Sequence, residues 1–289
     1  FTVVHEQFFT DTADYADLLL PATTFFEHKE LQTAYGHYHL QISHQAIAPL
    51  GECRSNVELF RDLARRFAFE KVDACFNEST DQMIDAALDS ESKWLEGIDR
   101  ARLEREGHIR LNLGDGPFLP FAQGNFPTAS GKAELYSESL AQAGLDPVVR
   151  FVPPTESRHS AQAKKYPLEL LSRKADNFLN TTFCNLPAHQ AMEQTELLEI
   201  HRDDAQARGI GEGDKVRVFN DRGSVVLKAH VNGTTQHGVV ATRLNWAKLS
   251  PNGVNINVLT SERLTDIGRG ATFYSTLVEV EPWNRGQTE

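Results

Sequence analysis

Short apolar runs and one longer alternating stretch predict strands in the front of the chain. Residues 2–5 and 17–20 read as two strands, the second a buried one, and residues 10–13 between them predict a helix start with Thr10 as its N-cap. Residues 38–48 alternate between apolar and polar positions, which predicts a third strand. We therefore interpret residues 1–50 as an α/β segment, the end of a parallel-sheet nucleotide-binding domain.

A helical pattern follows. Ser55 with Glu58 and Ser79 with Gln82 both fit a capping box, and apolar residues recur at helical spacing behind each pair. Residues 91–107 are strongly charged and predict a solvated helix, and residues 114–124 are rich in glycine and proline and predict a loop. Residues 51–160 are therefore predicted to form a mostly helical and irregular return segment, with a proline-rich linker and a domain boundary within 146–165.

The back of the chain, residues 161–289, is dominated by strand patterns. Residues 167–172, 238–244 and 275–280 predict strands, and residues 216–231 predict a hairpin around the turn 220–223. Residues 203–209 predict a short helix with Asp203 as the cap and Gly209 at the stop. Many short strands joined by turns favour a small β-barrel.

Composition narrows the classes of function. The net charge is −11 and no basic stripe is present, which argues against a nucleic-acid partner. The longest apolar runs are far too short for a membrane span, and nothing near Phe1 looks like a signal peptide. Because the chain opens on Phe1 and directly on a strand, we expect it to be a processed or excised piece of a longer protein. The sequence leaves the compartment open, with the cytoplasm or periplasm of a bacterium favoured.

Motifs for catalysis or metal binding are missing from the sequence. The three cysteines, Cys53, Cys75 and Cys184, form no C-x-x-C pair, so neither a disulfide framework nor an iron–sulfur or zinc site within this piece is expected. His37 and His39 share a strand face and His44 faces the other way, which favours solvated histidines over a metal site. The strand–loop–helix order of residues 2–13 places backbone N–H groups at a strand end, which suits a phosphate but is equally typical of an ordinary βα turn.

Several blocks resemble the dimethyl sulfoxide reductase family of molybdopterin enzymes. Residues 3–49 are similar to the family segment that reads F-x-T-x-T-A-x-x-A-D-V-V-L-P followed by a glutamate, and residues 126–135 resemble F-x-T-x-S-G-K-x-E-L. In the tail, residues 171–173, 180–182, 200–216 and 257–260 resemble the family's C-terminal dinucleotide-binding barrel. The blocks cover nearly the whole chain in the family's order.

The resemblance implies a six-stranded β-barrel of the double-psi type and a cofactor. Family members hold molybdenum or tungsten between two molybdopterin guanine dinucleotides, and their metal ligand and any iron–sulfur cluster lie in a front half that this chain does not include. The chain is thus expected to bind the cofactor of an intact oxidoreductase and to show no turnover alone. A small-molecule substrate and an electron-transfer partner would be those of the intact enzyme.

The resemblance also implies the residues of a cofactor site. In the front segment, Glu6 and Gln7 are expected to meet a guanine or ribose, and Thr10 and Thr12 a phosphate. In the barrel, the turn after the first strand supplies the expected cofactor contacts, together with one later asparagine: Arg173, Asn180, Thr181, Thr182 and Asn257. The simpler alternatives are that Asn180 caps a turn and that Arg173 forms an ordinary ion pair.

Two departures from the family pattern are visible. Many members have N-x-E-G-R where this chain has residues 34–38, Ala-Tyr-Gly-His-Tyr, and many have Tyr-Lys where it has Tyr274 and Ser275. Two other functions stay open: a molybdopterin enzyme without net redox chemistry, such as a hydratase or hydroxyltransferase, and a stand-alone binding module.

Overall fold

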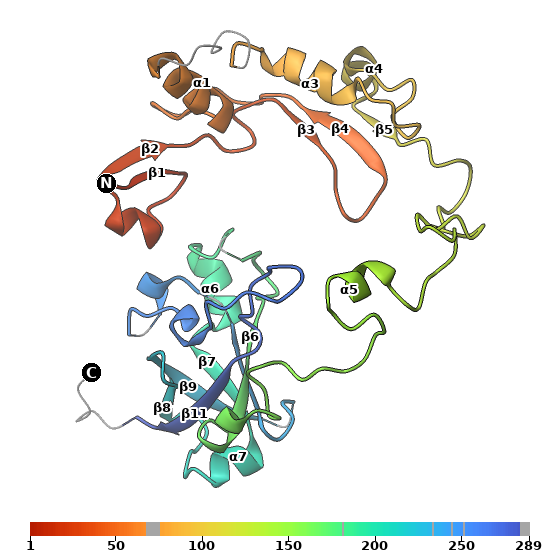
Figure 1. Cartoon of the computed structure of the whole chain (residues 1–289). Coiled ribbons are helices and arrows are strands. Elements are labelled where there is room, and N and C mark those ends of the chain that lie inside the picture. Colours follow the sequence, from red (N-terminus) through yellow and green to blue (C-terminus); the bar gives the residue numbers. More distant parts are fainter. Residues whose placement is uncertain (68–75, 181, 233, 244, 251, 284–289) are drawn as a thin grey trace. The chain divides into compact units, whose positions relative to one another are not determined.

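The chain forms two compact units in the computed structural model, which describes residues 1–67, 76–180, 182–232, 234–243, 245–250 and 252–283. The first unit is Phe1–Glu138 and the second is Ser139–Glu289 (Figure 1). The division into residues 1–50, 51–160 and 161–289 stays a prediction. Within the described ranges, no helix has the length and apolar character needed to cross a membrane.

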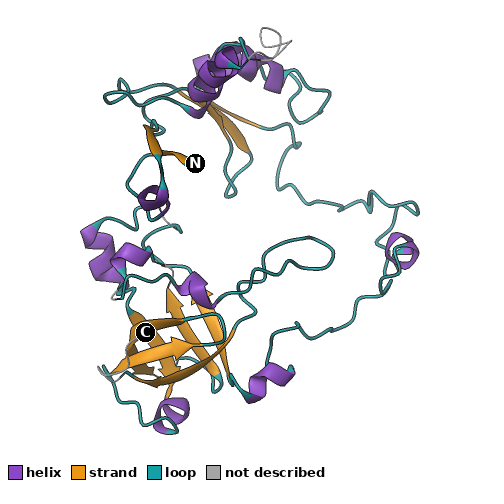
Figure 2. Cartoon of the chain, turned by 60° about the vertical axis from the view of Figure 1, so that its left-hand side comes forward, coloured by secondary structure: helices purple, strands orange, loops and turns teal. Residues whose placement is uncertain are grey.

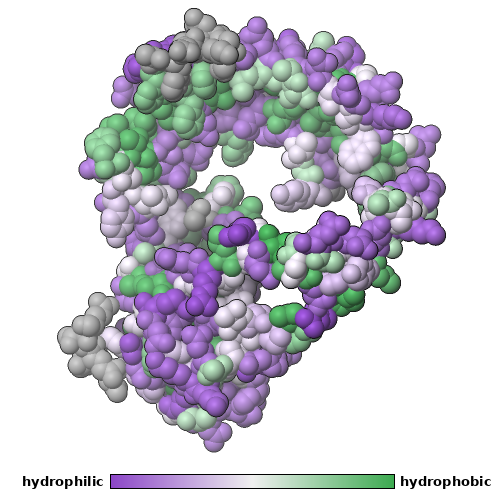
Figure 3. Space-filling view, in the orientation of Figure 1, coloured by the Kyte–Doolittle hydropathy of each residue, from purple (hydrophilic) through white to green (hydrophobic). Residues whose placement is uncertain are grey.

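The first unit opens with a parallel pair of strands. β1 (Val3–Glu6) pairs in parallel with β2 (Leu18–Pro21), with the 3₁₀ turn η1 (Thr12–Tyr15) between them. Both predicted strands are confirmed. The expected burial of the second strand is wrong, because β2 pairs only with β1 among the described residues and leaves Leu18 and Leu19 44% and 39% exposed. Figure 3 shows hydrophobic surface over this pair.

Thr10 does not cap a helix. The N-cap position of η1 is occupied by Asp11, and its side chain makes no capping hydrogen bond. The element is a 3₁₀ turn of only four residues. It is therefore not an α-helix whose first N–H groups Thr10 could cap. The prediction of Thr10 as N-cap is therefore wrong.

A three-stranded antiparallel sheet follows, with β4 (His39–Ser43) between β3 (Glu30–Gln32) and β5 (His108–Arg110). The prediction of a strand within residues 38–48 is confirmed. β3 and β5 were not predicted, because three residues carry too little alternation to detect. The sheet shares one core with the helices α3 (Thr80–Leu88) and α4 (Arg100–Glu106). The buried residues of this core are Leu40, Ile42, Ile84, Leu88, Ile98, Leu103 and Ile109.

Both predicted capping boxes are confirmed. Ser55 Oγ accepts the N–H of Glu58 at the start of α1 (Asn56–Arg66), and Ser79 Oγ accepts that of Gln82 at the start of α3. The predicted solvated helix over residues 91–107 is wrong in extent and character. Only Arg100–Glu106 is helical, and Leu103 in its middle is fully buried. One further short helix, α5 (Glu138–Gln142), spans the point where the two units divide.

The second unit is a closed six-stranded barrel, as predicted (Figure 2). Its strands are β6 (Leu168–Arg173), β7 (Leu197–His201), β8 (Lys215–Phe219), β9 (Ser224–Asn232), β10 (Val239–Arg243) and β11 (Leu277–Pro282). They follow one another around the barrel in the order β10-β6-β11-β8-β9-β7, with β6–β10 and β7–β9 parallel. Closure leaves no unpaired strand edge. Alternate residues fill the interior, among them Leu170, Leu198, Ile200 and Val240.

The second unit also contains two helices and three 3₁₀ turns, which precede or connect the barrel strands: α6 (Pro187–Glu193), α7 (Arg202–Gln206), η2 (Ala161–Lys164), η3 (Ala247–Leu249) and η4 (Ile256–Leu259). The prediction that Asp203 caps the short helix is wrong, because His201 is the N-cap and its Nδ1 accepts the N–H of Asp203. Gly209 does follow the helix with φ +67°. The loops after β6 and β10 meet in a buried cluster of Phe178, Cys184 and Trp246.

Candidate functional site

A pocket of about 600 Å³ lies at the carboxyl ends of β1 and β2. Glu6 and Gln7 line it from the end of β1, and Arg54, Ser55 and Asn56 line it from the start of α1. Strand ends beside a helix N-terminus are where open α/β sheets bind nucleotides, since backbone N–H groups and the helix dipole attract anionic groups.

Local hydrogen bonds hold the two predicted side chains of this pocket. Glu6 Oε1 accepts the N–H of Gln7 at 2.7 Å, and Gln7 Nε2 donates to the carbonyl of Thr23 at 2.8 Å. Gln7 therefore joins the ends of β1 and β2 and keeps its Oε1 for another donor. Thr10 and Thr12 were predicted for the same site but do not line this pocket.

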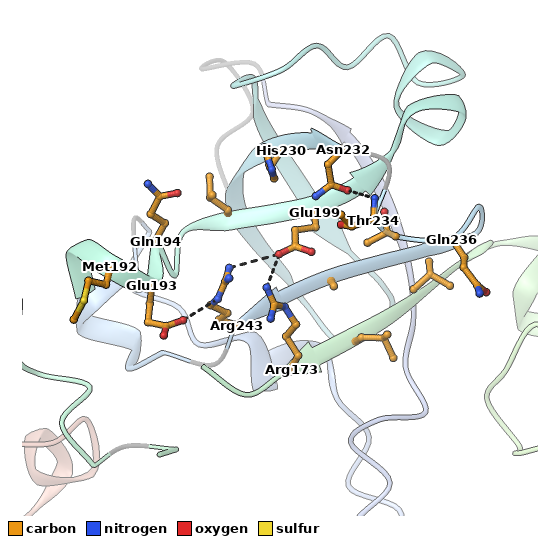
Figure 4. A pocket seen from close by; sticks show the side chains of 15 residues that line it. Arg173, Met192, Glu193, Gln194, Glu199, His230, Asn232, Thr234, Gln236 and Arg243 are labelled. Carbon is orange, nitrogen blue, oxygen red and sulfur yellow. Dashed lines mark hydrogen bonds and ion pairs between the residues drawn. The ribbon is translucent and has the colours of Figure 1, made fainter. Parts of the chain in front are cut away.

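A second pocket, of about 720 Å³, lies on the outer face of the barrel. Figure 4 shows its wall, which is built from outward-facing positions of β6, β10, β7 and β9. Arg173 and Arg243 end two neighbouring parallel strands in the same register, so their side chains lie on one face. Glu199 projects from β7 toward both arginines, and Glu193 lies at the end of α6.

Ion pairs run through these four residues in a chain. Glu193 Oε2 lies 2.9 Å from Arg243 Nε, Arg243 Nη1 lies 3.6 Å from Glu199 Oε1, and Glu199 Oε1 lies 2.6 Å from Arg173 Nη2. Arg173 thus forms the ordinary ion pair that was the simpler alternative. Its Nε, however, is buried without a hydrogen-bond partner among the described residues. The Oγ1 of Thr235, which lines the same pocket, is also buried without a hydrogen-bond partner among the described residues. Both atoms fit a polar ligand such as a nucleotide or pterin, because an unpaired buried polar group is costly.

Glu193 is ionised in this arrangement. Its burial raises the pKa of the carboxyl, but hydrogen bonds from the Nδ2 and N–H of Asn177 and the charge of Arg243 outweigh the burial and lower the pKa below its usual value. The carboxylate ties α6 to the loop after β6 and to the end of β10 at once.

Three further predicted barrel residues, Asn180, Thr182 and Asn257, lie outside both pockets. Asn180 and Thr182 are exposed in the turn after β6, where Asn180 has φ +53° and an isolated bridge joins Leu179 and Thr182. Asn257 is exposed in η4, and its N–H donates to Asn255 Oδ1 at 2.8 Å. Thr181 lies outside the described residues. The structure therefore brings Arg173 into a pocket but does not bring Asn180, Thr182 and Asn257 together with it.

Three histidine rings of the first unit lie close to one another. The rings of His37 and His39 lie 5.3 Å apart and those of His39 and His108 lie 5.5 Å apart. Across the part of the chain that the structure describes, no group of three or more histidine, cysteine or acidic side chains is arranged to hold a metal ion. Cys53 and Cys184 form no disulfide among the described residues, and Cys75 lies outside them.

Sequence reasoning missed Glu193, Glu199 and Arg243. A charged residue at an outward strand position, such as Glu199 between Leu198 and Ile200, looks like an ordinary solvated face. The only available signal was the shared position of Arg173 and Arg243 at strand ends, which requires the strand pairing to be known.

Comparison with known proteins gives two family matches. Residues 1–66 match the family described as "Molybdopterin oxidoreductase", and residues 168–277 match "Molydopterin dinucleotide binding domain". The second match begins at the first residue of β6 and ends at the first residue of β11, so it spans most of the barrel.

Relatives cover almost the whole chain. The probable oxidoreductase YoaE of Bacillus subtilis is 38% identical over 97% of this chain and 40% of its own length. The dimethyl sulfoxide reductase DmsA of Escherichia coli is 31% identical over 96% of this chain and 37% of its own length. The chain thus spans about two fifths of the length of the curated relatives that it resembles.

A solved structure has the same fold. Acetylene hydratase from Pelobacter acetylenicus superposes with a TM-score of 0.75 over 97% of this chain and 40% of its own, at 21% sequence identity. The two family matches and the relatives identify the same family. The barrel is the molybdopterin dinucleotide binding domain, and the chain belongs to the dimethyl sulfoxide reductase family of molybdopterin oxidoreductases.

Proposed function

We propose that this chain is the part of a molybdenum oxidoreductase that holds the molybdopterin guanine dinucleotides. The observation that carries this proposal is that Arg173 Nε is buried without a hydrogen-bond partner among the described residues, in the wall of a 720 Å³ pocket on a molybdopterin dinucleotide binding barrel. The planar guanidinium of Arg173 has its Nη2 in an ion pair with Glu199, and its Nε–H could donate to a phosphate or a pterin carbonyl.

The residues of this chain would bind and orient the cofactor. Arg173 would donate to it from the barrel wall, and Asn257, Asn180, Thr181 and Thr182 would offer amide and hydroxyl groups from the loops after β10 and β6. Glu6 and Gln7, at the end of β1, would meet a guanine or ribose of a dinucleotide. Thr10, in the loop before η1, and Thr12, the first residue of η1, are retained as candidate phosphate contacts. When bound, the cofactor supplies the redox chemistry and the protein positions it and excludes water.

The whole protein's activity follows as part of the proposal. We infer a two-electron oxidoreductase with a small-molecule substrate and a separate electron-transfer partner, both of which are met by the intact protein. The isolated 289-residue chain is expected to bind dinucleotide without turning over substrate. The proposed parts are residues 1–50 for the end of the α/β domain, 51–160 for the return segment and 161–289 for the barrel.

Binding of isolated molybdopterin guanine dinucleotide to the chain, followed by pterin fluorescence, tests the proposal. Arg173→Ala and Asn257→Ala are each expected to weaken binding about tenfold, since each removes a hydrogen bond to a buried polar group. Arg217→Ala is the matched control, because Arg217 on β8 pairs with Glu281 and lines neither pocket. Absence of binding by the unaltered chain, or equal binding by all four proteins, would overturn the proposal.

A further inference from the structure

Two buried side chains, Asn245 and Thr195, and the half-buried Gln190 form a closed ring of hydrogen bonds beside the barrel end. Asn245 Nδ2 donates to Thr195 Oγ1 at 2.7 Å, Thr195 Oγ1 donates to Gln190 Oε1 at 2.8 Å, and Gln190 Nε2 donates to Asn245 Oδ1 at 3.1 Å. Each donor in the ring faces an acceptor, so the ring has one direction only. Asn245 Oδ1 also accepts the N–H of Trp246 at 2.9 Å, and because that group can only donate, it fixes which end of the amide is the oxygen.

Asn245 connects the ring to the loop that follows β6. Cys184 Sγ donates to Asn245 Oδ1 at 3.2 Å, and the carbonyl of Cys184 accepts from Gln190 Nε2 at 2.6 Å. Cys184 is fully buried, and it stands two positions after Thr182. The ring thus holds the end of the turn that carries Asn180 and Thr182.

Asn245 also connects the ring to the loop that follows β10. Its main-chain carbonyl accepts from Asn255 Nδ2, and Asn255 Oδ1 in turn accepts the N–H of Asn257 at 2.8 Å. The side chain of Asn255 therefore spans from Asn245 to the first turn of η4. A continuous path of hydrogen bonds runs from Cys184 through Asn245 and Asn255 to Asn257.

We propose that Asn245 is a positioning residue that holds the loops after β6 and β10 in the one relative arrangement in which both can contact the same dinucleotide. Asn245 lies within the range that matches the dinucleotide binding domain, and it lines neither of the two pockets described above. The inference rests on the proposed function, because it takes Asn180, Thr182 and Asn257 as cofactor contacts. Buried polar networks of this kind specify one arrangement when every member is satisfied, and lose it when one member is removed.

Hydrogen exchange of the 289-residue chain tests the positioning role without cofactor. Asn245→Leu is expected to raise the exchange rates of peptides covering 178–186 and 252–260 together, by about tenfold or more, since a buried network is left with unpaired groups. Thr195→Val opens the ring by removing the acceptor of Asn245 Nδ2 while Asn245 itself is kept, and it should raise the same exchange rates to a smaller extent. This variant keeps the test valid if Asn245→Leu does not fold. Thr195→Ser keeps the hydroxyl and should match the unaltered chain.

Thr242→Val is the matched control. Thr242 lies on β10 three residues before Asn245, is buried, and donates to the carbonyl of Leu197 instead of to the ring. Its loss should leave both loops unchanged. Faster exchange in one loop only, or equal loosening in Thr242→Val, would overturn the positioning role.

Dinucleotide binding supplies the second measurement. Asn245→Leu and Thr195→Val should weaken the binding of molybdopterin guanine dinucleotide about tenfold, while Thr195→Ser and Thr242→Val should not. If the unaltered chain does not bind dinucleotide, the proposed function fails and the exchange data still decide whether Asn245 couples the loops. If the loops loosen but binding stays the same in every variant, the positioning role fails and the proposed function stands.

Discussion

Arg243 and Glu193 form an ion pair with 2.9 Å between Nε and Oε2, and only 1% of the Glu193 side chain is exposed. The pair joins the end of β10 to the end of α6. Since each charge is largely removed from water, each depends on the other and on the hydrogen bonds from Asn177.

Glu193→Gln is expected to destabilise the barrel unit by about 3 kcal/mol, because it leaves Arg243 with only Glu199 at 3.6 Å. Urea denaturation at pH 7 measures the loss. Glu281→Gln is the control, since its partner Arg217 is about one third exposed and such a pair contributes less than about 1 kcal/mol. Equal losses of unfolding free energy in the two variants would contradict the prediction that the buried pair contributes more to stability than the exposed one.

The same pair predicts a dependence of stability on pH. The pKa of Glu193 is lowered in the folded chain, so its contribution is present above the unfolded value of 4.5 and is lost as the pH falls through the folded value. The difference in the free energy of unfolding between the unaltered chain and Glu193→Gln should therefore shrink below pH 4.5. If this difference in the free energy of unfolding grows below pH 4.5 instead, the pKa of Glu193 is not lowered by folding.

Local signals in the sequence were sufficient for much of the fold. The capping boxes at Ser55 and Ser79 act within one helical turn, so their residues alone predict them. The strands of the barrel alternate long enough to be recognised, and the hairpin of β8 and β9 has a short turn. In contrast, β3 and β5 each contain three residues and depend on pairing with β4, which no local pattern encodes.

The candidate site was harder to predict from the sequence, because it also depends on strand pairing that no local pattern encodes. Arg173 was identified through family resemblance, and its placement in a pocket with Arg243 depends on the parallel register of β6 and β10. Asn245, Gln190 and Thr195 are ordinary polar residues in the sequence, separated by up to 55 positions, and only the closed fold brings them into one ring. The roles of Asn180, Thr181, Thr182 and Asn257 in cofactor binding stay predictions.

Lys29, the residue before β3, predicts a charge-dependent link to the helices α3 and α4 of the first unit. Its Nζ lies 2.6 Å from Asp81 on α3 and 2.7 Å from Glu104 on α4. Hydrogen bonds from Lys29 lower the pKa of both carboxyls. Lys29→Met should lower the thermal stability of the first unit at pH 7, and the difference should diminish at pH 3, because the contribution is lost as the pH falls from the unfolded values of 3.8 and 4.5 through the lowered pKa values of the folded carboxyls.

Lys132→Met is the control for this comparison, because Lys132 lies exposed in a loop. Calorimetry at the two pH values measures both variants against the unaltered chain. A loss of stability in Lys29→Met that is the same at pH 7 and pH 3 would mean that packing of the side chain, and not its charge, joins the helices.

Gly223 permits the β8–β9 turn to approach η4 closely. A Cβ at this position would lie 2.6 Å from Val258 Cγ2 and 3.4 Å from the carbonyl oxygen of Val258. Gly223→Ala should therefore destabilise the barrel unit by about 1–3 kcal/mol through overpacking. Val258→Ala in the same chain should recover part of that loss, and a double-mutant cycle in urea gives the coupling.

Gly36→Ala is the matched glycine control, because a Cβ there meets nothing within 4 Å and the backbone does not require a positive φ. Its effect on stability should be close to zero. If Gly223→Ala is equally harmless, or if Val258→Ala brings no recovery, then η4 does not rest on the turn as the distances indicate.

The closed barrel and the parallel pair of β1 and β2 predict a gradient of protection from hydrogen exchange within one chain. The barrel is closed and its interior residues, such as Ile200 and Val216, are fully buried, whereas β1 and β2 form a two-stranded pair with exposed apolar side chains. A lone pair of strands is marginal in water, because too little apolar surface is buried to offset the ordering of the chain. Amides of β1 and β2 should therefore exchange at least about a hundredfold faster than those of β7, β9 and β10 in the 289-residue chain, as measured by exchange and mass spectrometry. Equal protection would show that the parallel pair is stabilised by contacts that its burial does not reveal.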